Sequence, residues 1–148
     1  TIMEGDEEYQ KAILEPDFVK HCNEAQFNPE RRLCGVGVSS CCMVANGNVY
    51  PCAGWQEMVL GNLTETPLQE IWDNSEKIKW LRGLKMKDLG GGECCNCDKA
   101  AFCSPCLVRN ANESPTGDPL EINRHFCAVA AKNKQIVLDW RNAHFKEV

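Results

Sequence analysis

The chain has 148 residues, of which 43% are hydrophobic and 25% charged, and its formal net charge is −5. This length fits one domain or a small domain with extensions, and the mild acidity argues against a general nucleic-acid binder. The pair Arg31-Arg32 is therefore expected on the solvated surface. No apolar run approaches the roughly 20 residues of a membrane span. The acidic start TIMEGDEEYQ lacks a signal peptide's apolar core and an initiator Met, so we expect a cytoplasmic piece of a longer protein.

The first half of the chain is predicted to contain a short helix and one β-hairpin. Residues 4–14 are polar and helix-compatible, and Pro16 stops them. Asn46-Gly47 lies between two short apolar runs. This dipeptide favours a type I′ hairpin turn, which needs positive φ at both central residues. Strands are therefore predicted near 41–45 and 48–51.

The second half is predicted to contain two helical regions separated by a cysteine-rich stretch. Residues 66–69, TPLQ, match a capping box with Pro at the first helical position. A helical segment is therefore predicted at about 67–83, with a restart at Asn74-Ser75. Residues 90–120 are expected to be loop and turn, followed by a helix over 121–145. The predicted fold class is α+β, as a small metal-stapled domain with one hairpin, a central helical segment, cysteine-rich loops and a C-terminal helix.

Cysteine is the residue type that points to a function. The eleven cysteines are at positions 22, 34, 41, 42, 52, 94, 95, 97, 103, 106 and 127. An odd number without a signal peptide fits disulfides poorly, whereas thiols at CxxC spacing are good metal ligands. An early group (Cys34, Cys41, Cys52) and a late group (Cys94, Cys97, Cys103, Cys106, Cys127) would make two sites of four if one late cysteine crossed to the early site. Adjacent strand residues face opposite ways, so one of Cys41 and Cys42 should face the site.

These cysteines and their surroundings resemble a known family, the SPASM domain. It is the C-terminal auxiliary-cluster domain of many radical S-adenosylmethionine enzymes. The residues that follow the family's pattern, in order, are Cys34, Gly47, Cys52, Cys94, Cys97, Cys103, Cys106 and Cys127. The flanking segments CGVG, GNVYPC, LGNL, LQEIW and WLRGL are also similar, and the resemblance covers about residues 33–130. One spacing departs from the pattern, because Cys103-Ser-Pro-Cys106 is one residue shorter than the usual form.

The resemblance implies two [4Fe–4S] clusters and a three-part layout. Carried over by position, the first cluster would use Cys34, Cys41, Cys52 and Cys106, and the second would use Cys94, Cys97, Cys103 and Cys127. Cys42 and Cys22 are alternatives to Cys41. Residues 1–32 would be a lead-in from an N-terminal radical S-adenosylmethionine barrel. Residues 33–130 would be the SPASM domain, and residues 131–148 a helical extension.

The resemblance also implies a role in a larger enzyme that modifies a peptide or protein. The domain would transfer electrons, position the substrate, or both. S-adenosylmethionine would bind only in the barrel, because this chain has no Cys-x3-Cys-x2-Cys run and is not expected to be catalytic alone. The expected partners are the barrel and a peptide or protein substrate, with neither nucleic acid nor membrane.

Two other functions compete with this interpretation. The first is a zinc-binding cysteine-rich interaction module, because paired CxxC thiols are common zinc sites. An aerobically prepared fragment could take up zinc even if iron is the natural metal. The second is a disulfide-stapled extracellular domain, against which the odd cysteine count weighs.

Overall fold

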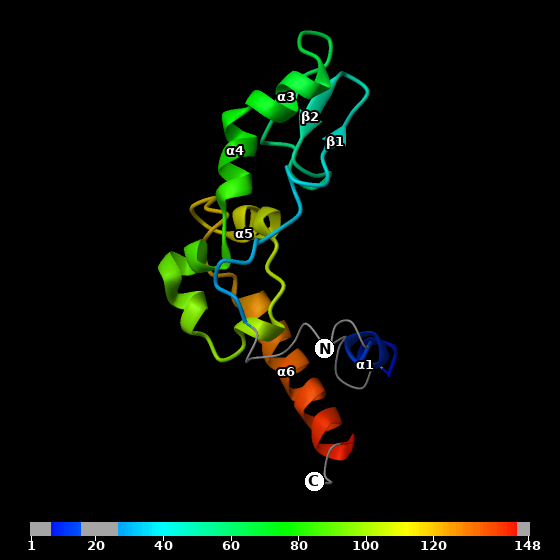
Figure 1. The fold of residues 1–148 in the computed structure, drawn as a ribbon, viewed down its shortest axis with the longest axis vertical. Helices are drawn as coiled ribbons and strands as arrows, with labels where there is room; N and C mark the ends of the chain where they lie inside the picture. The colour runs from blue at the N-terminus through cyan, green and yellow to red at the C-terminus, as the bar shows by residue number, and fades with distance from the viewer. Residues whose placement is uncertain (1–6, 16–26, 145–148) are drawn as a thin grey trace.

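The computed structural model describes residues 7–15 and 27–144. Its elements are α1 (Glu7–Ile13), β1 (Cys42–Met43), β2 (Asn48–Tyr50), β3 (Gly61–Asn62), α3 (Leu68–Asn74), α4 (Glu76–Gly83), the 3-10 segments η2 (Met86–Asn96) and η3 (Ala100–Phe102), α5 (Leu107–Glu113) and α6 (Arg124–His144). Figure 1 shows the sheet with α3 and α4 at one end, α5 in the middle, and α6 with α1 at the other end. The predicted α+β class with a cysteine-rich region and a C-terminal helix is confirmed.

The predicted hairpin is present, but its turn differs from the prediction. In β1 and β2, Cys42 pairs with Tyr50 and Met43 with Val49, antiparallel. The turn is closed by the Gly47 N–H, which donates to the Val44 carbonyl at 2.9 Å. Gly47 has φ +87°, whereas no other residue type in the described chain has positive φ. The predicted type I′ turn is therefore wrong, because only one of its two central residues is left-handed.

A third strand, β3, completes the sheet and was not predicted. It pairs antiparallel with β2, with Asn48 opposite Asn62 and Val49 opposite Gly61. A Cβ on Gly61 would lie 2.8 Å from Ile71 Cγ1, so glycine lets α3 pack directly on the sheet. A two-residue strand of Gly and Asn has neither apolar alternation nor β propensity, so no sequence pattern indicates it.

The central helical segment is two helices, as the predicted restart at Asn74-Ser75 suggested. Ser75 has an extended backbone and separates α3 from α4. The predicted capping box is wrong, because Pro67 occupies the N-cap and no side chain caps α3. The Thr66 N–H instead donates to the Asn62 carbonyl at 2.9 Å, which places Thr66 in the turn that follows β3. The Gln69 side chain donates along the helix to Asp73 at 2.6 Å.

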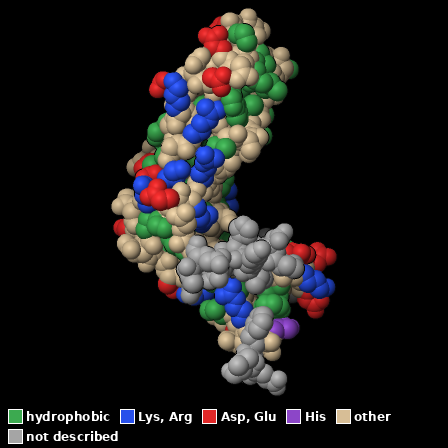
Figure 2. Space-filling view, in the orientation of Figure 1, with side chains coloured by type: hydrophobic (Ala, Val, Ile, Leu, Met, Phe, Trp, Pro, Cys, Tyr) green, Lys and Arg blue, Asp and Glu red, His purple; other side chains and the backbone are tan. Residues whose placement is uncertain are grey.

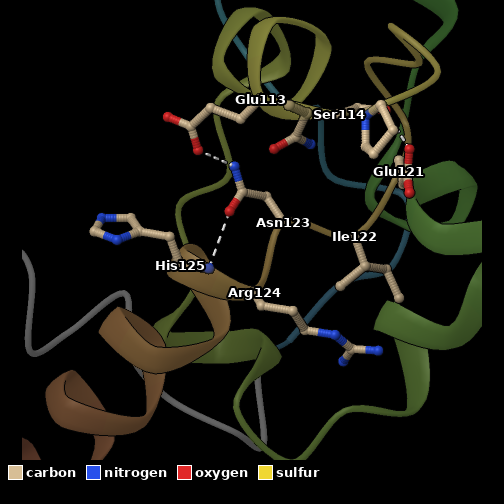
Figure 3. Close-up of a pocket in the computed structure, with 9 residues that line it drawn as sticks. Glu113, Ser114, Glu121, Ile122, Asn123, Arg124 and His125 are labelled. Atoms are coloured by element: carbon tan, nitrogen blue, oxygen red, sulfur yellow. Dashed lines mark hydrogen bonds between the residues drawn. The ribbon is translucent and has the colours of Figure 1, made fainter.

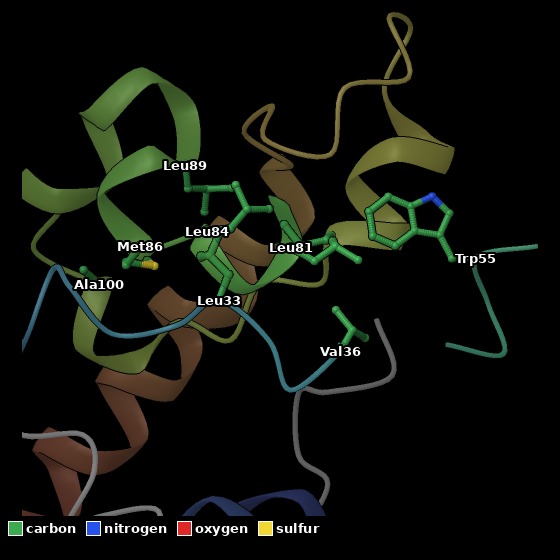
Figure 4. Packing of buried hydrophobic residues seen from close by; sticks show 9 residues of the cluster. Leu33, Val36, Trp55, Leu81, Leu84, Met86, Leu89 and Ala100 are labelled. Atoms are coloured by element: carbon green, nitrogen blue, oxygen red, sulfur yellow. The ribbon is translucent and has the colours of Figure 1, made fainter. Parts of the chain in front are cut away.

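Three apolar clusters follow one another along the molecule. The sheet cluster contains Val49, Leu60, Ile71 and Ile78. The middle cluster contains Leu33, Val36, Trp55, Leu81, Leu84, Met86, Leu89, Ala100 and Leu107. Figure 4 shows Leu33, Leu84 and Leu81 gathered between Met86 on one side and Trp55 on the other. The terminal cluster contains Ile13, Phe102 and Val137, from α1, η3 and α6.

Residues 90–120 are more regular than the predicted loop and turn. They include the part of η2 that follows its left-handed glycines, all of η3, and α5, which begins directly after Cys106. Leu107 and Asn110 are buried at helical spacing, a short signal that the polar composition of LVRNANE conceals. The terminal helix is confirmed as α6, and α1 lies inside the predicted 4–14, of which residues 4–6 are outside the described chain. No described helix is both long enough and apolar enough to span a bilayer.

Candidate metal centre

Four of the predicted ligands come from three parts of the chain and lie in one region of the structure. We call Cys94, Cys97, Cys103 and Cys127 the late four. Cys94 belongs to η2, Cys97 and Cys103 directly follow η2 and η3, and Cys127 lies in the first turn of α6. Cys94, Cys97 and Cys103 also pack against the middle cluster, which keeps water from one side of them.

The electrostatics of the late four show that they are neighbours. Burial, with smaller contributions from the nearby Cys127, Cys94 and Cys97, raises the pKa of Cys103 to about 11. Burial is also the main cause that raises the pKa of Cys94, followed by Cys127, Cys97 and Cys95. Without a metal, Cys103 is therefore a neutral thiol at pH 7. Binding to a metal requires the thiolate, so ligation would release protons from this group.

Glycines shape the backbone around the late four. Gly90, Gly91 and Gly92 are consecutive left-handed residues, with φ values of +60°, +60° and +94°. The Gly90 N–H donates to the Leu120 carbonyl at 2.8 Å. A Cβ on Gly90 would lie 2.4 Å from Ile122 Cγ1 and 3.5 Å from Cys94 Sγ. Glycine therefore allows the chain to turn tightly between the Cys94 thiol and the segment that leads into α6.

Gly90→Ala is expected to destabilise the protein by roughly 2–5 kcal/mol, because left-handed strain adds to overpacking against Ile122. Gly91→Ala is the matched control. Gly91 has the same φ, but a Cβ there meets no atom within 4 Å. It should cost only about 1–2 kcal/mol from strain. Anaerobic urea unfolding of both variants measures the difference, and equal losses would contradict the proposed close approach at Gly90.

Contacts from α6 hold the cysteine loop against Cys127. The Lys134 ammonium donates to the Asp98 carbonyl at 2.8 Å and lies 3.3 Å from its carboxylate. The adjacent residue Asn133 is buried, and its amide donates to the Phe102 carbonyl at 3.3 Å. The Tyr9 hydroxyl donates to the Asn133 amide oxygen at 2.5 Å, which connects α1 to the same contact. The loop from Cys97 to Cys103 is thus fixed to α6 near both of its ends.

We call Cys34, Cys41, Cys52 and Cys106 the early four, of which Cys41 and Cys52 flank the hairpin and Cys106 precedes α5. Cys41 precedes β1 and Cys52 follows β2, so both lie at the open end of the hairpin. The segment after Cys52 lies on α5, because a Cβ on Gly54 would be 3.4 Å from Val108 Cγ1. Cys106 is the residue directly before α5. Cys34 is exposed and the other three are partly buried.

The structure distinguishes the remaining cysteines in part. Cys42 lies within β1 opposite Tyr50, and its thiol contacts the Met43 carbonyl at 3.9 Å. Cys41 packs against the sheet cluster. Cys95 is partly buried beside Cys94 and affects the Cys94 pKa more weakly than Cys127 or Cys97 does. Cys22 lies outside the described residues.

The cysteine thiols suit an iron–sulfur cluster because of their chemical type, although their side chains are not tightly gathered. Over residues 7–15 and 27–144, no three Cys, His, Asp or Glu side chains are gathered as tightly as a metal ion would need. The late four are nevertheless thiols only, drawn from separate segments and shielded on one side by apolar side chains. Thiolates in such surroundings are the usual ligands of iron–sulfur clusters, and they also suit zinc.

A polar cavity of about 210 Å³ lies beside the start of α6. The Asn123 amide donates to the Glu113 carboxylate at 2.6 Å, and its oxygen accepts the His125 N–H at 2.9 Å (Figure 3). Asn123 thereby caps α6 and ties it to the end of α5, four residues before Cys127. The sequence interpretation missed this residue, although an Asn directly before a helical pattern is a recognised start signal.

The comparisons with known proteins point to one family. The family model SPASM, described as an iron–sulfur cluster-binding domain, matches residues 34–98. An AdoMet-dependent heme synthase of Methanosarcina barkeri is 34% identical over 88 residues, which is 60% of this chain and 24% of the relative. An AdoMet-dependent heme synthase of Nitratidesulfovibrio vulgaris is 34% identical over 83 residues, 56% of this chain and 22% of the relative. The chain thus spans about a quarter of the length of these relatives. No solved structure is significantly similar to it.

Proposed function

Residues 34–98 belong to the SPASM family of iron–sulfur cluster-binding domains, and from this premise we propose that the chain holds two [4Fe–4S] clusters as the auxiliary part of a radical S-adenosylmethionine enzyme. The late four would hold one cluster, and the early four, including the crossing Cys106, would hold the other. Such clusters supply one-electron transfer and cross-link the segments that ligate them. The observation that carries this proposal is the match of the iron–sulfur family model to residues 34–98. It is supported by the position of Cys94 and Cys103, which lie close enough to the other late cysteines for these to raise their pKa.

The residues of this chain would have two roles toward the clusters. Thiolates supplied by η2, the loop after η3 and α6 would add metal cross-links between segments that the contacts of Lys134 and Asn133 already hold together. The middle cluster and the left-handed glycines would limit solvent access to the sulfurs. Solvent access and hydrogen bonds to sulfur are among the factors that set a cluster's reduction potential.

The proposal includes the layout of the whole protein. Residues 1–32 would lead in from a radical S-adenosylmethionine barrel, residues 33–130 would bind the clusters, and residues 131–148 would be a C-terminal helical extension. S-adenosylmethionine would bind in the barrel. A cytoplasmic location is part of the same proposal, because a reducing compartment keeps cysteine thiols available for iron.

The substrate of the whole enzyme has two candidates. The resemblance favours a peptide or protein, positioned over the barrel by this domain. The names of the relatives instead favour heme synthesis, because both are AdoMet-dependent heme synthases. Anaerobic turnover of the full-length enzyme with a heme precursor, followed by mass analysis of the product, separates the two. Formation of heme would support the second candidate, and its absence alongside a modified peptide would support the first.

The metal content of the chain tests the proposed function directly. After anaerobic purification and reconstitution, we expect about eight iron and eight acid-labile sulfide per chain with little zinc. About one or two zinc and no sulfide, even after reconstitution, would instead support the zinc module. About four iron would limit the proposal to a single cluster.

A further inference from the structure

Arg31 is held against the loop that carries Cys103. One guanidinium nitrogen donates to the Cys103 carbonyl at 2.8 Å and to the Ala100 carbonyl at 3.4 Å. The same nitrogen lies 3.7 Å from the Met86 sulfur. The expectation that Arg31-Arg32 is a solvated surface pair is therefore wrong for Arg31, whose side chain is partly buried, and right for Arg32, which is exposed.

The backbone around Arg31 is fixed as well. Its N–H donates to the Asn28 carbonyl at 3.0 Å, and its carbonyl accepts the Met86 N–H at 2.9 Å. The guanidinium carbon also lies 5.8 Å from the centre of the Phe27 ring. These contacts hold both the backbone and the guanidinium of Arg31, so the cation has little freedom to move away from the Cys103 loop.

Within the described chain, the charge of Arg31 is not balanced by a carboxylate. Arg82 is similar in this respect, but its guanidinium donates to the Gly37 carbonyl at 2.6 Å rather than to the loop that carries Cys103. Figure 2 shows several Lys and Arg side chains on one face of the molecule. Ion pairs in the described chain include Lys79 with Glu76, Lys87 with Glu30, Arg109 with Glu113, and both Lys99 and Lys134 with Asp98. Among the described residues, Arg31 enters no such pair, and the partners it does have are neutral carbonyls and a thioether.

We propose that Arg31 is a fixed positive charge that favours the reduced state of the cluster held by the late four. This inference rests on the proposed function. A [4Fe–4S] core ligated by four thiolates is anionic, and uptake of one electron from a reductant adds one negative charge. A nearby cation stabilises the more negative state, more strongly where water is partly excluded. Arginine does not lose its proton in proteins, so the effect is present at all working pH values.

Arg31→Gln in the reconstituted chain tests this inference. The reduction potentials of the two clusters are measured by dithionite titration followed by electron paramagnetic resonance. We expect one of the two potentials to become more negative in Arg31→Gln and to stay close to the parent value in Arg31→Lys, which keeps the charge. Arg32→Gln is the matched control, because it removes a neighbouring exposed charge and should leave both potentials unchanged.

The outcomes separate this inference from the proposed function. A parent chain without iron and sulfide would overturn the proposed function itself. A parent with both clusters and an Arg31→Gln variant with unchanged potentials would overturn only the role of Arg31. An equal shift in Arg31→Lys and Arg31→Gln would indicate a structural brace and would also overturn it. The electron paramagnetic resonance signal comes only from molecules that hold a cluster. Incomplete cluster binding in a variant therefore does not affect the comparison of reduction potentials. If the Arg31→Gln variant binds no late cluster, the reduction potential of the Arg31→Lys variant tests the inference. A potential close to the parent value would support the inference, and a shifted potential would overturn it.

Discussion

Cys127→Ala is expected to halve the iron and sulfide content of the reconstituted chain, from about eight to about four of each. Cys127 is the single member of the late four on α6. After burial, its charge is the largest cause of the raised pKa of Cys103. Its removal leaves three thiols from the η2–η3 region and should release the late cluster. The early cluster should remain, because none of its proposed ligands lies on α6.

Three further variants define this result. Cys106→Ala should give the complementary loss, releasing the early cluster and sparing the late one, since Cys106 is the proposed crossing ligand. Cys95→Ala and Cys42→Ala should leave iron at the parent level, because each is adjacent to a proposed ligand but outside both sets. Loss of both clusters in Cys127→Ala and Cys106→Ala alike would contradict two separate sites. Loss in Cys95→Ala with full loading in Cys127→Ala would contradict the ligand assignment.

Phe102→Ala is expected to lower the free energy of unfolding by about 3–5 kcal/mol, the usual loss for a buried aromatic. Phe102 is 1% exposed and lies between Ile13 of α1 and Val137 of α6. It directly precedes Cys103, so the cavity would loosen the loop that bears this thiol. We therefore expect weaker retention of the late cluster as well. Anaerobic urea unfolding and the rate of iron release to a chelator measure the two effects.

Trp80→Ala is the control for the loss of a large aromatic side chain. Trp80 is 42% exposed on α4, and its truncation should change the free energy of unfolding by no more than about 0.5 kcal/mol. A similar loss of unfolding free energy in both variants would show that Phe102 stabilises the protein no more than an exposed aromatic side chain does. A stable Phe102→Ala variant with normal iron release would show that α1, η3 and α6 are held together by other contacts.

The sequence predicts those helices and strands whose defining residues are neighbours in the chain. Asn46-Gly47 between apolar runs indicated the hairpin, and the long amphipathic pattern before His144 indicated α6. The spacing of the cysteines indicated the family, which the match over residues 34–98 confirms. The assignment of particular cysteines as ligands of the iron–sulfur clusters remains a prediction, which the grouping of the late four supports.

The missed features depend on contacts between distant segments. β3 exists because Gly61 allows Ile71 to pack on the sheet. The capping box failed because Thr66 is bonded to Asn62 instead of starting α3. Arg31 looked like a surface charge because nothing in its neighbourhood in the sequence reveals the Cys103 carbonyl, 72 residues away. Such contacts arise only when the chain folds, so residue type and periodicity do not encode them locally.

The arrangement of the apolar clusters has a consequence for how the protein is damaged by air. Three separate small cores allow partial opening, with each part having its own free-energy cost. Among the described residues, the buried side chains of the terminal cluster are Ile13, Phe102 and Val137. Opening of this cluster would free the loop from Cys97 to Cys103 while the sheet end stays folded. Oxidants would then reach the sulfurs next to α6 through a fluctuation that leaves most of the protein intact. Oxygen sensitivity of the late four would accordingly depend on the packing of α1 and α6 rather than on global unfolding.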